Sequence, residues 1–149
     1  MGIYNYRRRP TVQVNVGRTV IGSSSSVRLQ SMGNVSTLDT EAAALRAMRI
    51  ARAGGELVRF TTQGAREASN MAAISEAIRR EGCYVPLVAD VHFNPAAAFE
   101  AARHIEKVRI NPGNFVDPAR TFLRIDYSDE EYAGELQRLR SAFVPLLDL

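Results

Sequence analysis

Two arginines and an acid–histidine pair lie in or directly after short apolar segments. Arg59 and Arg109 each lie inside an apolar run, and Asp90 and His92 close a third run. A guanidinium in apolar surroundings is costly unless it meets an anion. Arginine also suits planar, bidentate binding of phosphate. Two such arginines beside polar strand ends therefore indicate a phosphate or diphosphate ligand. The alternative is a structural ion pair of either arginine with Asp90.

Asp90 and His92 are titratable groups two residues apart, so they share one face if the strand continues through them. General acid–base chemistry and metal binding both suit such a pair. A metal site is disfavoured, because the only other histidine is His104, near the end of a predicted helix. Considered alone, the pair favours a structural role, in which Asp90 orients an arginine and His92 hydrogen-bonds loop backbone.

The segment Asn111-Pro112-Gly113-Asn114 is a turn cluster directly after the run that contains Arg109. Its backbone N–H groups and side-chain amides can hold phosphate oxygens or a hydroxyl group. Ordinary turn chemistry is the alternative.

A hairpin, a linker and four strand–helix units must position these residues. The hairpin is predicted over residues 11–22, and a polar linker follows over 23–26. Asp39 or Thr40, Asn94 before Pro95, and a capping box of Ser128 and Glu131 are helix-start signals. The periodicity predicts strands over 27–30, 57–61, 86–91 and 107–110, and helices over 39–53, 65–81, 94–104 and from 128 through 143.

Repeated strand–helix units favour a parallel sheet with helical crossovers. A complete eight-unit barrel needs about 250 residues, and this chain has 149, with apolar residues still accumulating over 144–149. We therefore predict an α/β fold, the N-terminal half of a (β/α)8 TIM barrel over 27–149, preceded by a tail, hairpin and linker over 1–26. The rival is an open doubly wound sheet, but the loop at 31–34 lacks its Gly-rich phosphate motif. Half a barrel has an open sheet edge, which predicts self-association.

Composition excludes several classes of protein. No stretch approaches the roughly 20 apolar residues of a membrane span, and no apolar run follows the N-terminal arginines as a secretory signal requires. A single cysteine, Cys83, excludes a disulfide framework and a thiolate-built metal site within this chain, and favours a reduced, cytoplasmic setting. The net charge of +3 does not by itself indicate nucleic acid. A basic RNA-binding module that uses Arg7 to Arg9 is kept as an alternative.

Four motifs together resemble one enzyme family. They are VRLQSM at 27–32, AGGELVR at 53–59, PLVADVHF at 86–93 and KVRINPGN at 107–114. On these motifs the chain resembles the 4-hydroxy-3-methylbut-2-en-1-yl diphosphate synthase family of non-mevalonate isoprenoid biosynthesis, and the last two motifs are highly specific to it. The resemblance runs from about residue 7 to the C-terminus. Residues 61–64 and 115–147 are similar to the large form found in plants and some bacteria, which carries an extra domain.

The resemblance implies a TIM barrel whose mouth binds 2-C-methyl-D-erythritol 2,4-cyclodiphosphate. It also implies a C-terminal domain in which three cysteines and a glutamate hold a 4Fe-4S cluster, and these ligands are expected to lie beyond Leu149, outside this chain. Two electrons from ferredoxin or flavodoxin then open the cyclic diphosphate and expel a hydroxyl group. By motif match, Arg59, Arg109 and Asn111 contact the diphosphate or another part of the substrate. The residues that line or shape the same mouth are Asp90, His92 and Asn114.

The chain departs from the family pattern at Gly33 and Val35, where the family usually has threonines, so two hydroxyl groups are missing from that loop. With the cluster domain outside the chain, we expect no reductase activity from these residues alone, and neither a membrane nor a nucleic acid as partner. A barrel similar to dihydropteroate synthase is the alternative enzyme, against which the motif at 109–114 argues.

Overall fold

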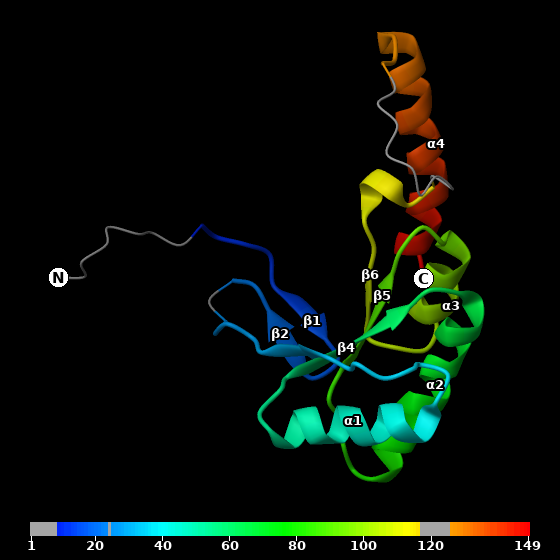
Figure 1. The fold of residues 1–149 in the computed structure, drawn as a ribbon. Helices are drawn as coiled ribbons and strands as arrows, with labels where there is room; N and C mark the ends of the chain where they lie inside the picture. Colours follow the sequence, from blue (N-terminus) through cyan, green and yellow to red (C-terminus); the bar gives the residue numbers. More distant parts are fainter. Residues whose placement is uncertain (1–8, 24, 117–125) are drawn as a thin grey trace, which may run out of the picture.

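The computed structural model describes residues 9–23, 25–116 and 126–149. They form a short hairpin followed by strands that alternate with helices (Figure 1). In chain order the elements are β1 (Val14–Val16), β2 (Thr19–Ile21), β3 (Gln30–Met32), α1 (Thr40–Arg52), β4 (Leu57–Thr62), α2 (Ala65–Arg80), β5 (Leu87–Val91), α3 (Pro95–Ala102), β6 (Lys107–Arg109), the 3-10 turn η1 (Pro112–Asn114) and α4 (Asp129–Leu147).

The sheet has the topology of a barrel segment. Its four strands are parallel and pair in the order β3-β4-β5-β6, which is also their order in the sequence. A doubly wound sheet reverses its strand order and carries helices on both faces. Here the buried side chains of α1, α2 and α3 meet the same face of β4 and β5. The predicted α/β fold with half of a TIM barrel is therefore confirmed over the described residues.

Local signals begin the helices where the sequence predicts. The Asp39 side chain accepts a hydrogen bond from the backbone N–H of Ala42 at 3.0 Å and caps α1. Asn94 does the same for α3 through Ala97, with Pro95 at the first helical position. The predicted capping box of α4 is complete, because Ser128 and Glu131 each bind the other's backbone N–H.

The first strand of the sheet starts three residues later than predicted and ends two residues later. The sequence pattern placed it over 27–30, whereas β3 spans Gln30–Met32. Val27 and Leu29 are mostly exposed. Gln30 pairs with Leu57, the first residue of β4, so no partner strand is available before that point. The available neighbour, and not the apolar run, determines where this strand starts.

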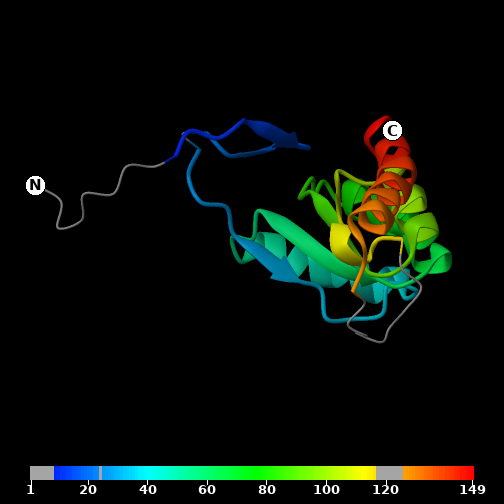
Figure 2. The same cartoon turned by 90° about the horizontal axis from the view of Figure 1, so that it is seen from above.

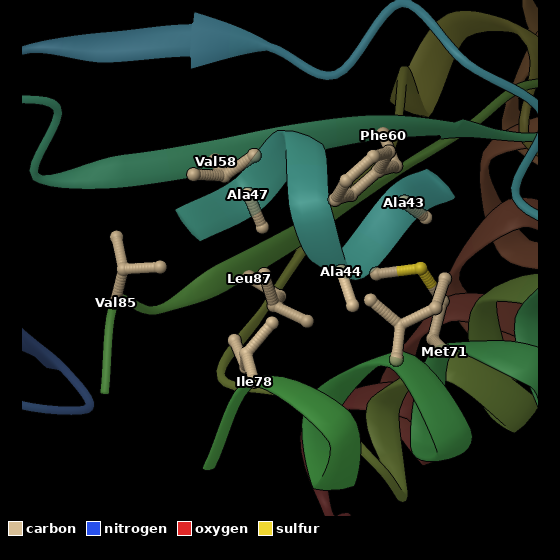
Figure 3. Close-up of a cluster of buried hydrophobic side chains, with 10 residues drawn as sticks. Ala43, Ala44, Ala47, Val58, Phe60, Met71, Ile78, Val85 and Leu87 are labelled. Atoms are coloured by element: carbon tan, nitrogen blue, oxygen red, sulfur yellow. The ribbon is translucent and has the colours of Figure 1, made fainter. Parts of the chain in front are cut away.

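The largest core cluster lies between α1, α2 and the sheet, and small residues of α1 form its centre (Figure 3). Ala43, Ala44 and Ala47 are buried against Val58 and Phe60 of β4. Three apolar residues of α2 complete the cluster from the face that their spacing predicts: Met71, Ile74 and Ile78. Leu45 of α1 shares the helical spacing but is 51% exposed, because the alanines occupy the face that approaches the sheet.

Helix α4 packs on α3 only through its C-terminal half. Leu139 and Phe143 contact the cluster formed by α3, β5 and Phe115. The Phe143 ring packs edge-on against the Phe115 ring, with 5.8 Å between the two ring centroids. Tyr132 and Leu136, on the same amphipathic stripe, are exposed. Figure 1 shows that the N-terminal part of α4 extends past the end of the sheet. None of the helices in the described part of the chain is long and apolar enough to cross a membrane.

The hairpin predicted over 11–22 is formed by β1 and β2, which pair antiparallel around Gly17 at φ +56°. Val16 is buried and, with Ile21, packs on Leu57 and Val88. Because side chains alternate along a strand, these two sheet residues face away from the neighbours that meet the helices. The hairpin therefore lies over the amino end of the sheet face that the helices leave free (Figure 2).

Candidate functional site

Sheet register brings the two arginines and the aspartate together. Asp90 on β5 is the register partner of Arg109 on β6 and of Thr61 on β4. Arg59 lies two residues before Thr61, so it points to the same face of the sheet. Strand β5 thus carries the acid, and its two neighbours, β4 and β6, carry one arginine each.

This face is divided into an apolar and a polar layer. Leu57 and Val88 lie nearest the amino ends of their strands, under the hairpin. Arg59 and Asp90 follow two residues later on the same strands and the same face. In parallel α/β folds, ligands bind at the carboxyl ends of the strands. The polar layer lies toward the carboxyl ends of the strands, and the apolar layer lies at their amino ends, where the hairpin covers it.

Asp90 accepts a hydrogen bond from each arginine through a different oxygen. Arg59 Nη2 lies 2.5 Å from Asp90 Oδ2, and Arg109 Nη1 lies 3.2 Å from Asp90 Oδ1. The Asp90 side chain is only 6% exposed, against 27% for Arg59 and 38% for Arg109. The structural ion pair that the sequence left open is therefore present, and it involves both arginines, whose outer portions still reach solvent.

The charge environment keeps the Asp90 carboxylate ionised. Burial favours the neutral acid and by itself would raise its pKa. The hydrogen bond and charge of Arg59, with a smaller contribution from His92, outweigh burial and hold the pKa of Asp90 below its ordinary value. The cluster consequently carries one negative and two positive charges.

His92 extends this cluster toward the open end of the sheet. Its Nε2 lies 3.0 Å from Arg109 Nη1 and 3.3 Å from Asp90 Oδ1. When Nε2 carries no hydrogen it can accept a hydrogen bond from Arg109, and when it carries one it can donate to Asp90. One nitrogen therefore cannot make both hydrogen bonds at once. The expected structural role of Asp90, orienting an arginine, is found. The expectation that His92 bonds loop backbone is wrong, because the partners found for it are the side chains of Arg109 and Asp90.

The loop after β5 turns sharply at the next residue. Phe93 has a φ of +55°, a left-handed conformation that is rare for an aromatic residue. Asn94 then caps α3 and also donates from its side chain to the carbonyl of Gln63 at 3.3 Å. These contacts hold the strained turn beside His92, which is typical of a functional loop. The sequence analysis missed Phe93, and nothing in its residue type signals a positive φ.

The turn after β6 adds further polar groups beside the site. Asn111 Oδ1 accepts from the backbone N–H of Gly113 at 3.1 Å, so it acts first as a turn-forming residue. Asn114 Oδ1 is buried without a hydrogen-bond partner among the described residues, and so is Nε of Arg59. Buried polar atoms are ordinarily satisfied. A bound polar ligand is one way to satisfy these two.

No metal or cluster site is found among the described residues. Cys83, the single cysteine, packs against the α1–α2 core cluster, where it is partly buried at the end of α2. Over residues 9–23, 25–116 and 126–149, no group of three or more His, Cys, Asp or Glu side chains has the arrangement of a metal site. The cluster around Asp90 contains guanidiniums that can bind an anion and an imidazole that can exchange a proton.

The backbone at Gly33 lies too close to a buried ring to accept a side chain. A Cβ on Gly33 would lie 2.1 Å from Cε1 of the buried Phe60 ring. The ring therefore occupies the space where a side chain at position 33 would begin.

Arg7 and Arg8, on which the RNA alternative depends, lie outside the described residues, and Arg9 is exposed.

Comparisons with known proteins identify the family. Residues 11–135 match the family model described as the GcpE TIM-barrel domain. The chain is 55% identical over all 149 residues to 4-hydroxy-3-methylbut-2-en-1-yl diphosphate synthase (flavodoxin) of Bacteroides fragilis, and 49% identical over 144 residues (97% of the chain) to the protein of that name from Akkermansia muciniphila. It spans 24% of the length of each. The chain therefore belongs to the GcpE TIM-barrel domain family.

Proposed function

We propose that this chain is the diphosphate-binding part of a 4-hydroxy-3-methylbut-2-en-1-yl diphosphate synthase. In the proposal the whole enzyme reduces 2-C-methyl-D-erythritol 2,4-cyclodiphosphate to 4-hydroxy-3-methylbut-2-enyl diphosphate. The observation that carries it is the pair of partly exposed guanidiniums, Arg59 and Arg109, held by Asp90 on the two parallel strands that flank β5. The family assignment favours this function over a dihydropteroate synthase-like barrel.

In this proposal the chain binds and orients the substrate. The guanidiniums of Arg59 and Arg109 hold diphosphate oxygens by charge-assisted hydrogen bonds. Asn111 and Asn114 contribute side-chain amides at the rim, and His92 offers a hydrogen-bonding nitrogen at the open end of the sheet. The apolar layer under the hairpin keeps water from the lower end of the same face. These residues place the ring of the substrate but do not reduce it.

In this proposal the electrons reach the substrate through a part of the enzyme outside this chain. A 4Fe-4S cluster supplies two electrons when it is bound, and its ligands belong to a separate domain of the proposed enzyme, since this chain has only Cys83. The relatives are named as flavodoxin enzymes, which supports flavodoxin as the donor, with ferredoxin as the other candidate. A cytoplasmic location and the division into 1–26 and 27–149 are parts of the same proposal.

Titration calorimetry with the cyclic diphosphate tests the proposal. Arg59→Gln and Arg109→Gln should each weaken binding roughly 10- to 100-fold, because a hydrogen bond to a charged group contributes about 1.5–3 kcal/mol. Arg52→Gln is the matched control, since Arg52 is exposed in the last turn of α1 and carries the same charge. Equal weakening by all three variants, with a steep fall as salt rises, would instead indicate non-specific polyanion binding, as the RNA alternative predicts.

A further inference from the structure

The buried carboxylate of Asp90 lies between two cations that come from different strands. Its two oxygens are divided between the arginines, Oδ2 to Arg59 and Oδ1 to Arg109. β4 and β6 do not pair with each other, because β5 lies between them. Strands two places apart are separated by about 10 Å. Asp90, on the middle strand, is the side chain that connects the two arginines across this gap.

Without Asp90, nothing among the contacts of the described residues would hold the two guanidiniums at a fixed separation. Arginine has a long, flexible side chain that loses much entropy when it is fixed, and two like charges on one sheet face repel each other. Arg109 would retain its contact with His92 Nε2, and no other side-chain partner is found for Arg59 in the described part of the chain. The separation of the two cations therefore depends on this carboxylate.

A carboxylate next to a diphosphate site is unfavourable unless it is shielded. Asp90 is 6% exposed and lies under the more exposed guanidiniums. Each guanidinium has five N–H groups and gives one to Asp90 in these bonds. Further N–H groups remain for a ligand on the solvent side.

We infer that Asp90 is a positioning residue: it does not contact the diphosphate but sets the distance between Arg59 and Arg109 that allows both to bind one diphosphate. This inference rests on the proposed function. It differs from the motif-based expectation, in which Asp90 lines the mouth as a substrate-side residue. The positioning role and the charge of Asp90 predict opposite effects of Asp90→Asn on diphosphate binding. Asp90→Asn removes a negative charge beside an anion site, so charge alone predicts tighter binding. Loss of positioning predicts weaker binding.

The test compares two inorganic anions that differ in length. Pyrophosphate can engage both arginines at once, whereas phosphate can be held by one. Calorimetry should therefore show that Asp90→Asn weakens pyrophosphate binding about 10-fold or more, the effect of one lost charged hydrogen bond. Phosphate binding should change little, so the preference for pyrophosphate falls. Asp39→Asn is the matched control: it changes the net charge equally, and Asn also caps a helix.

Three results separate the possible failures. A wild-type chain that binds no pyrophosphate contradicts the proposed function itself. A wild-type chain that binds pyrophosphate, with an Asp90→Asn variant that binds it equally or more tightly and keeps the preference, overturns only the positioning role. If Asp90→Asn does not fold, Asp90→Glu decides the question, because it keeps the charge but moves the carboxylate by one methylene. Positioning predicts a reduced preference in that variant, and an unchanged preference overturns it.

A second readout does not depend on binding. The Nε–Hε signal of Arg59 in a nitrogen–proton NMR spectrum reports the environment of its guanidinium. In the wild type it should differ from the signals of exposed arginines such as Arg52. In Asp90→Asn it should move toward them while the backbone amide signals of β4 stay in place. An unmoved Arg59 signal in a folded variant would contradict the inference.

Discussion

Gly33→Ala is the substitution that most directly tests how this barrel segment is packed. The added Cβ would lie 2.1, 2.5 and 2.6 Å from three atoms of the Phe60 ring. Non-bonded carbons prefer about 3.5–4.0 Å, so the ring must withdraw by more than about 1 Å. Phe60 is fully buried and packs in the cluster that contains Ala43 and Ala44, so its ring can move only if neighbouring side chains also shift. Overpacking of this kind costs about 1–3 kcal/mol, and we expect the upper end of that range.

The expected loss is partly offset by the unfolded state. Replacing glycine with alanine restricts the unfolded chain and returns about 0.4–1 kcal/mol. The net destabilisation is therefore about 2 kcal/mol, or roughly 4–8 °C in Tm for a chain of this size. Urea denaturation followed by circular dichroism measures it. Gly54→Ala serves as a contrasting glycine substitution, because a Cβ there meets no atom within 4 Å, although its φ of +94° adds strain of a different kind.

A double-mutant cycle decides whether Phe60 is the cause. Phe60→Val alone should destabilise the protein, because it leaves a cavity. Combined with Gly33→Ala it should cost less than the sum of the two changes by at least about 1 kcal/mol, since the smaller side chain makes room for the new methyl group. Additivity within about 0.5 kcal/mol, or a Gly33→Ala variant as stable as the wild type, would refute the packing argument.

Three further predictions follow from the same structure. Val16→Ala should lower stability by roughly 2 kcal/mol in urea denaturation, because it removes two buried methyl groups from the contact between the hairpin and Val88. The stability that Asp90 contributes should be fully present above the ordinary carboxyl pKa of about 3.9 and be lost as pH falls through its lowered folded pKa, so wild type and Asp90→Asn should converge in acid denaturation. The exposed edges of β3 and β6 should make the 149-residue chain self-associate, which light scattering at high and low concentration checks, with one monomeric mass at both counting against it.

The features that the sequence predicted correctly are those determined by neighbouring residues. Asp39, Asn94 and Ser128 cap their helices through bonds to N–H groups three residues away, so short motifs suffice to find them. The start of β3 was misplaced because it depends on where β4 begins, 27 residues later. An apolar run such as that around Leu29 does not reveal whether a partner strand lies beside it.

The candidate site shows the same division. Arg59 and Arg109 stood out because a guanidinium is unexpected in an apolar strand, and Asp90 was correctly considered as their partner. That one carboxylate binds both arginines follows from strand register, which no single segment contains. The partners of His92 were mistaken for the same reason, since Arg109 is 17 residues away in the chain but adjacent in the sheet.

A crystal structure of this protein with inorganic pyrophosphate bound tests the central claim most directly. The account predicts one diphosphate on the sheet face opposite the helices, with its oxygens within hydrogen-bonding distance of the guanidiniums of both Arg59 and Arg109. Asp90 should remain beneath them without a contact to the ligand. A pyrophosphate bound elsewhere, for example among the exposed arginines of α1, with the cluster around Asp90 unchanged, would contradict it.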